Sequence, residues 1–129
     1  VVTDIKAFLE ERLEFAVSRG IARERVMLDP GIGFGKTVVH NLDLLRRLDE
    51  LVAIGQPLVI GTSRKSFLGK ITGRDADHRV PATIATNVLA YERGARIFRV
   101  HDVAPVHDAL SVTAATVTAQ WPTPTSSTT

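Results

Sequence analysis

Cysteine is absent from the 129-residue sequence, and aromatic side chains make up only 5% of it. The absence of cysteine excludes disulfide frameworks, thiol catalysis and cysteine–zinc sites together. No apolar run approaches the roughly 18 residues that a membrane-spanning helix needs. We therefore expect a cytoplasmic protein that has no membrane partner.

The charge of the chain is nearly balanced, with 16 basic and 14 acidic side chains and a net charge of +2. The isoelectric point of 9.4 nevertheless looks strongly basic. With no cysteine and one tyrosine, few groups titrate between neutrality and the lysines, so a small positive excess moves the isoelectric point far. Basic residues also alternate with acids, as in RLDE and ERLE, and are not gathered on one face. We predict no nucleic-acid partner.

Helical and strand-like spacings of apolar residues alternate along the chain. Helices are expected at residues 4–20, 41–54, 81–93 and 105–120, with a short one from about 65, and strands at 26–28, 58–60 and 96–100. The inward faces of the first two long helices are expected to hold Ile5, Phe8, Leu9, Leu13, Ala16 and Val17, and Leu42, Leu45, Leu48, Leu51 and Val52. This alternation predicts an α/β fold with right-handed crossovers and a parallel sheet. Residues 121–129 carry two prolines and no periodicity and are expected to be a disordered tail.

Two features indicate that the chain is part of a larger fold. Three strands make a thin sheet with two open edges, which is a liability in an isolated domain. The chain also begins Val1-Val2-Thr3, without methionine, directly before a helical pattern. We expect this start to be a cut in a longer protein.

The stretch from Pro57 to Gly69, PLVIGTSRKSFLG, is the centre of the functional prediction. An apolar strand ends at Gly61, and two hydroxyl and two cationic side chains follow before a helix begins. In α/β proteins such a helix start offers free N–H groups and a positive helix end to an anionic ligand. A helix cap with two solvated cations is the alternative interpretation of this stretch alone.

Polar side chains follow all three predicted strands. Asp29 ends the first strand, Ser63 and Lys65 follow the second, and Arg99 and His101 lie at the end of the third. Because the carboxyl ends of parallel strands share one face, these five side chains should converge there. Singly, each has a structural explanation, such as a turn, a salt bridge or a buried core histidine. Together, one acid and several cationic or hydroxylic groups suit a ligand that has a donor-rich polar ring and an anion.

Nucleotide hydrolysis and metal binding are weaker alternatives. Gly35-Lys36-Thr37 after a Gly-rich loop is similar to a Walker A motif, but Pro30 stands where that motif needs its first glycine. Proline lacks the N–H that a phosphate cradle uses. The four histidines, at positions 40, 78, 101 and 107, show no zinc-type spacing on one helix face. We therefore expect neither a P-loop nor a metal site made by this chain's own side chains.

Three runs of sequence resemble dihydropteroate synthase. They are LDPGIGFGKT (28–37) with His40-Asn41, GTSRKSFLG (61–69) and RVHDV (99–103), and they occur in the family's order and at about its spacing. The resemblance covers nearly the whole chain up to the tail. It implies that residues 1–120 are the C-terminal part of a TIM (β/α)8 barrel, from the helix before strand six through strand eight and its helix. A whole barrel takes about 250 residues, so roughly half of it is absent.

The resemblance implies a transferase of folate biosynthesis that sulfonamides inhibit. The family condenses p-aminobenzoate with 6-hydroxymethyl-7,8-dihydropterin pyrophosphate and releases dihydropteroate and pyrophosphate. In this chain Asp29 would accept hydrogen bonds from the pterin ring, and Lys65 would bind the pterin carbonyl. Arg99 and His101 would hold the pyrophosphate as charge develops on it. The family's route is dissociative and needs no nucleophilic side chain.

The second substrate would lie against the same loops. The resemblance implies that Phe34 packs on the benzoate ring, that Lys65 lines its pocket, and that Ser66, or as second choice Ser63, binds the carboxylate. The implied substrate-binding set is Asp29, Gly33, Phe34, Ser63, Arg64, Lys65, Ser66, Arg99 and His101, of which Lys65, Arg99 and His101 are the catalytic members.

Other parts of the family's machinery lie outside this chain. Magnesium would act with the pyrophosphate, and its asparagine ligand is expected in the missing N-terminal half, so we expect no activity from the fragment alone. The family dimerises through helices near its C-terminus, so the helices at 81–93 and 105–120 are candidates for a homodimer interface. A non-catalytic barrel fragment that binds its parent subunit remains the alternative function.

Overall fold

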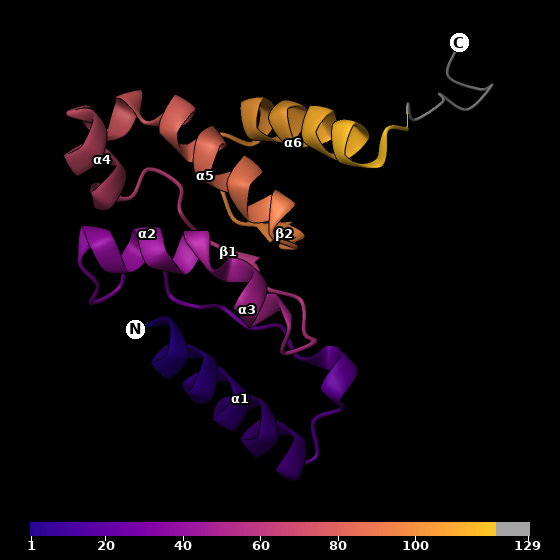
Figure 1. Cartoon of the computed structure of the whole chain (residues 1–129). Helices are drawn as coiled ribbons and strands as arrows, with labels where there is room; N and C mark the ends of the chain where they lie inside the picture. The colour runs from indigo at the N-terminus through magenta and orange to yellow at the C-terminus, as the bar shows by residue number, and fades with distance from the viewer. Residues whose placement is uncertain (121–129) are drawn as a thin grey trace.

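The structure, a computed structural model, describes residues 1–120; the tail predicted at 121–129 lies outside the described residues. Helices follow one another as an arc, with α1 at one end and α6 at the other, and the strands lie on one side of it (Figure 1). The elements are α1 Val2–Ser18, the 3-10 helix Arg23–Arg25, α2 Val38–Arg46, α3 Leu48–Val52, β1 Val59–Ile60, α4 Ser66–Thr72, the 3-10 helix Ala76–His78, α5 Val80–Glu92, β2 Ile97–Phe98 and α6 Val103–Thr118.

The predicted parallel sheet is present, with shorter strands than expected. β1 and β2 pair in parallel, with Val59 opposite Ile97. The predicted strand 26–28 is only an isolated parallel bridge between Leu28 and Leu58. In that bridge the Val59 N–H donates to the Leu28 carbonyl over 2.8 Å. The three segments therefore lie side by side in chain order, and their carboxyl ends all lie at the same end of the sheet.

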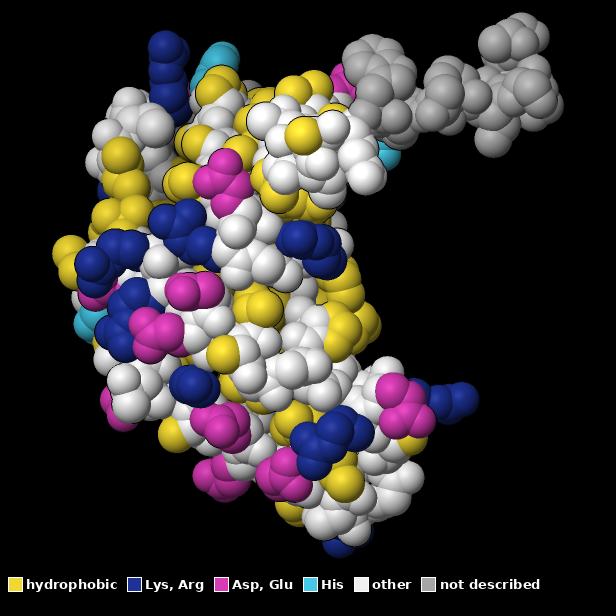
Figure 2. Space-filling view, turned by 45° about the vertical axis from the view of Figure 1, so that its right-hand side comes forward, with side chains coloured by type: hydrophobic (Ala, Val, Ile, Leu, Met, Phe, Trp, Pro, Cys, Tyr) yellow, Lys and Arg dark blue, Asp and Glu magenta, His cyan; other side chains and the backbone are white. Residues whose placement is uncertain are grey.

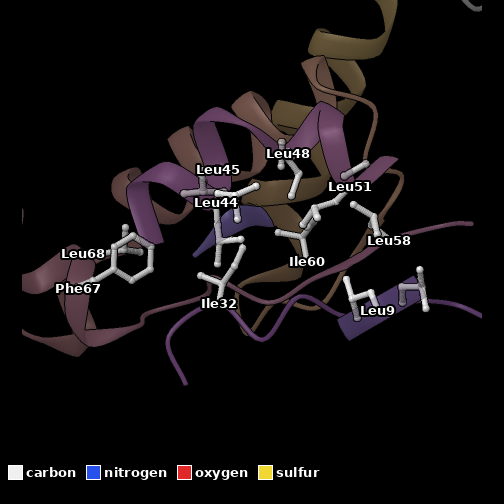
Figure 3. Packing of buried hydrophobic residues seen from close by; sticks show 14 of the residues in the cluster. Leu9, Ile32, Leu44, Leu45, Leu48, Leu51, Leu58, Ile60, Phe67 and Leu68 are labelled. Carbon is white, nitrogen blue, oxygen red and sulfur yellow. The ribbon is translucent and has the colours of Figure 1, made fainter. Parts of the chain in front are cut away.

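The core lies between this sheet and the α2–α3 layer. Leu44, Leu48 and Leu51 are fully buried, and they face Ile60 and Leu58 of the central strand segment (Figure 3). Ile32, from the loop before α2, fills the same layer, while Leu9 of α1 lies at one end of it and Phe67 and Leu68 of α4 lie at the other (Figure 3). Leu13 of α1 belongs to the same buried cluster. Burial of these side chains is the main force that holds the strand ends in register.

The predicted helix 41–54 was wrong in its start and its continuity. The helix starts earlier, at Val38, where Thr37 caps it through a hydrogen bond from the His40 N–H. It also breaks at Arg47, which has φ −108° and ψ 24°. The buried face contains Leu44 and the polar Asn41, whereas Leu42, expected inside, is 43% exposed. The other three leucines predicted to face inward are buried as expected, so among the leucines the error is confined to Leu42.

Other helices agree more closely with their prediction. α5 and α6 lie within two residues of the expected bounds and pack side by side (Figure 1). α1 buries Leu9 and Leu13 as expected, but Phe8 is 60% exposed, so its predicted inward position was wrong.

The surface carries both signs of charge. Figure 2 shows Lys and Arg interspersed with Asp and Glu over the face in view, as the alternating sequence pattern predicts. Within residues 1–120, no helix combines the length and the apolar character that a membrane crossing requires.

Candidate functional site

The carboxyl ends of β1 and β2 enclose a small pocket. Its volume is about 170 Å³, and its lining comprises Gly61, Ser63, Lys65, Arg99, Val100 and His101. Four of the five polar residues predicted to converge therefore share one pocket. The fifth, Asp29, stands at its rim beside Arg99. The rule that parallel strands end on one face accounts for this meeting of residues that are far apart in sequence.

Arg99 and Asp29 form a loose pair that leaves both groups available to a ligand. The Arg99 Nη1 lies 3.6 Å from Asp29 Oδ2, and the two side chains are 61% and 41% exposed. The second carboxylate oxygen of Asp29 accepts a hydrogen bond from the Gly31 N–H over 2.8 Å, which fixes its direction. The guanidinium of Arg99 lies over Gly61, where an added Cβ would come within 2.6 Å of Nη2. Gly61 thus makes room for the cation at the floor of the pocket.

Ser63 orients His101. The Ser63 Oγ, in a side chain that is only 7% exposed, accepts a hydrogen bond from the His101 main-chain N–H over 3.0 Å. The same hydroxyl lies 2.7 Å from Nδ1 of the imidazole. Both contacts hold the ring in one orientation. The Nε2 atom has no hydrogen-bond partner within residues 1–120 and is free to meet a ligand.

Lys65 connects the pocket to the loop before α2. Its ammonium donates to the Ile32 carbonyl and lies 4.3 Å from the centroid of the Phe34 ring, within cation–π range. Burial lowers the pKa of Lys65, and the neighbouring positive charge of Arg99 lowers it further, while Asp29 acts in the opposite direction. Lys65 therefore gives up its proton more readily than an ordinary lysine.

The loop from Gly31 to Thr37 is fastened by two residues to which the sequence analysis gave no role at the site. The Lys36 ammonium donates to the carbonyls of Gly31 (2.7 Å) and Phe34 (3.0 Å), so it closes the loop on itself. The Asn41 Oδ1 accepts the Gly33 N–H over 2.8 Å. Because Lys36 is bound to loop carbonyls, it does not project toward a phosphate, and the Walker A interpretation has no structural support. The signal that could have revealed Asn41 is its position within an apolar stripe.

The remaining predicted substrate-binding residues surround the pocket without lining it. Phe34 is 66% exposed beside the Lys65 ammonium, and Gly33 lies against the Lys65 side chain. Ser66 is the first residue of α4 and is exposed. Arg64 differs from the rest, because its guanidinium binds Asp102 through two hydrogen bonds of 3.1 and 2.8 Å and points away from the pocket.

The chemistry available is anion binding next to a hydrogen-bond acceptor. Lys65, Arg99 and His101 offer donors and positive charge, and Asp29 offers a carboxylate to a ring that carries N–H groups. No group of three or more His, Cys, Asp or Glu side chains within residues 1–120 could hold a metal ion. The side chains of this site suit a charged substrate and an anionic leaving group, but those within residues 1–120 do not form a metal cage.

Comparison with known proteins gives one consistent result. The sequence model of the family described as "Pterin binding enzyme" matches residues 1–101. Dihydropteroate synthase of Haemophilus influenzae is 44% identical over 119 residues, which is 92% of this chain and 43% of that protein. Dihydropteroate synthase of Neisseria meningitidis serogroup C is 47% identical over 112 residues, which is 85% of this chain and 40% of that protein.

Solved structures agree in fold as well as in sequence. The Yersinia pestis dihydropteroate synthase in complex with a sulfonamide drug has a TM-score of 0.88 and 42% identity over 92% of this chain. The Thermus thermophilus enzyme in complex with 4-aminobenzoate has a TM-score of 0.83 and 47% identity over 88% of this chain. The matched region is 43% of the first structure and 46% of the second. This chain thus spans less than half the length of each of these four relatives.

Proposed function

The chain belongs to the family of pterin-binding enzymes, and on that premise we propose that it forms the C-terminal part of a dihydropteroate synthase barrel. The observation that carries the proposal is the meeting of Lys65, Arg99 and His101 in one pocket, with Asp29 at its rim. The parallel sheet has an open edge at β2 within the described residues, and the missing strands of a (β/α)8 barrel would continue it. The reaction proposed joins p-aminobenzoate to 6-hydroxymethyl-7,8-dihydropterin pyrophosphate.

The pterin would be held between Asp29 and Lys65. The Oδ2 atom of the Asp29 carboxylate, which is only loosely paired with Arg99, can accept hydrogen bonds from the amino and N–H edge of the ring. That edge resembles a guanidinium in its donor pattern. The Lys65 ammonium can donate to the ring carbonyl in exchange for its bond to Ile32. These two contacts would place the methylene carbon of the substrate above the floor of the pocket.

Arg99 and His101 would receive the leaving pyrophosphate. As the carbon–oxygen bond breaks, negative charge grows on the leaving oxygen, and donors fixed in advance stabilise that charge without reorganising. Gly61 fixes the place of Arg99, and Ser63 fixes the ring of His101. The aniline nitrogen of p-aminobenzoate would then attack the resulting cation and lose a proton to solvent, while Phe34 and Ser66 would hold its ring and its carboxylate.

Magnesium would act with the pyrophosphate, but the residues of this chain do not fit a metal ion. The charged side chains that line the pocket are cationic, and the carboxylate at its rim, Asp29, lies 3.6 Å from the Arg99 guanidinium. We therefore assign the ion to residues outside this chain and route no step of the mechanism through it.

A chimeric enzyme tests the proposal. This chain replaces the matching 119-residue segment of the Haemophilus influenzae relative, which then supplies the rest of the barrel. We expect the chimera to form dihydropteroate from the two substrates, and we expect the 129-residue chain alone to form none. The Lys65→Ala chimera should lose turnover far more than thermal stability, because the charge of Lys65 belongs to the site. A folded but inactive chimera would refute the proposal.

Two further assignments complete the proposal. We assign the protein to the cytoplasm, the compartment expected from a sequence without cysteine or a membrane-spanning run. We also propose a homodimer formed by α5 and α6, which pack together and expose Leu89, Val112 and Val117. The alternative function, a non-catalytic fragment that binds its parent subunit, is supported by the same open sheet edge. A stop codon upstream of Val1 in the natural reading frame would favour that alternative, whereas the remaining barrel strands encoded there would favour the enzyme.

A further inference from the structure

Arg64 stands between Ser63 and Lys65, yet its side chain turns away from the pocket that both of them line. Its backbone has φ +57°, in the left-handed region. That conformation is unfavourable for a residue with a Cβ, and it persists only where the surroundings impose it. The contacts that hold Arg64 in this conformation therefore indicate the role of the turn.

Two neighbouring segments, the start of α5 and the start of α6, hold Arg64 by three different groups. The Arg64 N–H donates to Thr83 Oγ1 of α5 over 3.1 Å, and Thr83 is fully buried. The Arg64 carbonyl accepts a hydrogen bond from Arg79 Nη1 over 2.8 Å. Arg79 in turn lies against Gly69, where an added Cβ would come within 2.6 Å of the Arg79 Cζ. The guanidinium of Arg64 pairs with Asp102. The donor, the acceptor and the side chain of one residue are thus all anchored.

Asp102 extends this anchoring to the other half of the pocket. It directly follows His101 and is the N-cap residue of α6, but its side chain makes no capping hydrogen bond to that helix. Both carboxylate oxygens are instead bound to Arg64. The hydrogen bonds from Arg64 hold the pKa of Asp102 below its usual value, so the carboxylate remains charged and paired at neutral pH.

We propose that the Arg64–Asp102 pair is a clamp that positions the catalytic groups, an inference that rests on the proposed function. On one side of the clamp are Ser63 and Lys65, and on the other are Arg99 and His101. The strands that carry these groups have only two residues each, so their pairing alone fixes the two loops weakly. The bidentate pair holds the loops at a set separation without touching the substrate. Arg64 and Asp102 are therefore positioning residues.

The chain contains a matched control for this clamp. Arg47 and Glu50 form the same bidentate geometry, with distances of 2.6 and 2.8 Å, at the junction of α2 and α3. Their side chains are 38% and 42% exposed, against 35% for Arg64 and 20% for Asp102. Neither control residue lines the pocket. Loss of either pair removes a similar interaction, but only one pair connects the two halves of the site.

The first measurement needs no substrate. Nitrogen-15 spectra of histidine imidazoles are recorded for the 129-residue chain and for Arg64→Met and Arg47→Met. The clamp predicts that Arg64→Met changes the Nδ1 shift of His101, because Ser63 is displaced, while Arg47→Met leaves it unchanged. The other three histidines serve as internal references. An unchanged His101 in Arg64→Met would overturn the clamp, whatever the chimera does.

The second measurement uses the chimeric enzyme. We expect Asp102→Asn to lower kcat/KM roughly ten- to hundredfold, because misplacing catalytic groups by about 1 Å costs this much. Glu50→Gln should lower it less than about twofold, and thermal unfolding should shift alike in both variants. Equal turnover in the two variants would overturn the clamp, as would normal turnover of a destabilised Asp102→Asn. The two proposals can fail separately. If the parent chimera is inactive but the Nδ1 shift of His101 changes in Arg64→Met, the proposed function is refuted and the clamp is supported.

Discussion

Burial and the neighbouring charge of Arg99 both make the protonated form of Lys65 less favourable. Its pKa lies below the ordinary value of 10.5, so the ammonium loses its proton, and with it a donor and a charge, at a lower pH than an exposed lysine does. We predict that affinity of the chimera for the pterin pyrophosphate falls between neutral pH and pH 10.5. Lys65→Arg should abolish this alkaline decline, because a guanidinium stays protonated throughout the range. Calorimetric titration across that range makes the comparison, and an identical decline in Lys65→Arg would assign the effect to another group.

Gly33 and Gly35 offer a matched test of how the loop meets Lys65. Both have positive φ, of +89° and +61°, so alanine strains the backbone at either position. Only at Gly33 would a Cβ also collide with the Lys65 side chain, at 2.6 Å from Cδ, whereas nothing lies within 4 Å at Gly35. We predict that both variants lose about 1–2 kcal/mol of stability through strain. Gly33→Ala should also weaken pterin pyrophosphate binding. Similar binding by the two variants would show that Lys65 moves aside without loss.

The strand-end rule predicted the pocket, but not what holds it together. Asp29, Arg99 and His101 could be identified from sequence because each follows an apolar run where a parallel strand must end. The partner of Arg64 could not, because it lies 38 positions further along the chain and the pairing depends on the left-handed turn. A basic residue in a motif rich in cations is predicted to face the ligand, and here it faces Asp102.

At the scale of elements, α2 and α5 each bury one asparagine, and the two asparagines differ in their hydrogen bonds. Asn41 and Asn87 are 1% and 0% exposed, and each occupies an inward position of its helix. The Oδ1 of Asn41 accepts the Gly33 N–H, whereas the Oδ1 of Asn87 has no hydrogen-bond partner within the described residues. We predict that Asn41→Ala costs about 1–3 kcal/mol more stability than Asn87→Ala, since it leaves a donor without its partner. Urea unfolding of the two variants measures the difference, and equal losses would mean that water readily satisfies Gly33.

The same asparagine explains why helix prediction failed at this element. The spacing of apolar residues identifies the inward face of a helix only when that face is wholly apolar. In α2 the polar Asn41 lies on the inward face, because its side-chain oxygen accepts a hydrogen bond from Gly33 in the preceding loop. Leu42 was therefore assigned inward in place of Leu44. α5 also buries polar residues, Thr83, Thr86 and Asn87, yet its bounds and those of α6 agree with the pattern. The strands are shorter than predicted because a run of apolar residues indicates burial, whereas a strand also requires backbone hydrogen bonds to a neighbouring segment.

At the scale of the whole molecule, an apolar groove borders the open edge of β2. It has a volume of about 410 Å³ and lies between β2, α5 and the first half of α6, with Phe98, Val106 and Leu110 among its lining. Val103, also in this groove, is 63% exposed. A sheet edge and an apolar groove that stay exposed together favour association with a further strand and helix. In the proposed barrel, the missing N-terminal half would provide both.

Association with that half can be tested without relying on catalysis. We predict that this chain binds the part of the Haemophilus influenzae relative that it does not match, and that the mixture melts at a higher temperature than either piece. Val103→Asp should abolish the complex, since it places a charge in the groove. Val39→Asp is the control, because Val39 is 64% exposed, lies in the first turn of α2 and does not line the groove. Native mass spectrometry of the mixtures reads the outcome. Equal loss of the complex in both variants, or no complex with the unaltered chain, would mean that the open edge of β2 is not where the other half binds.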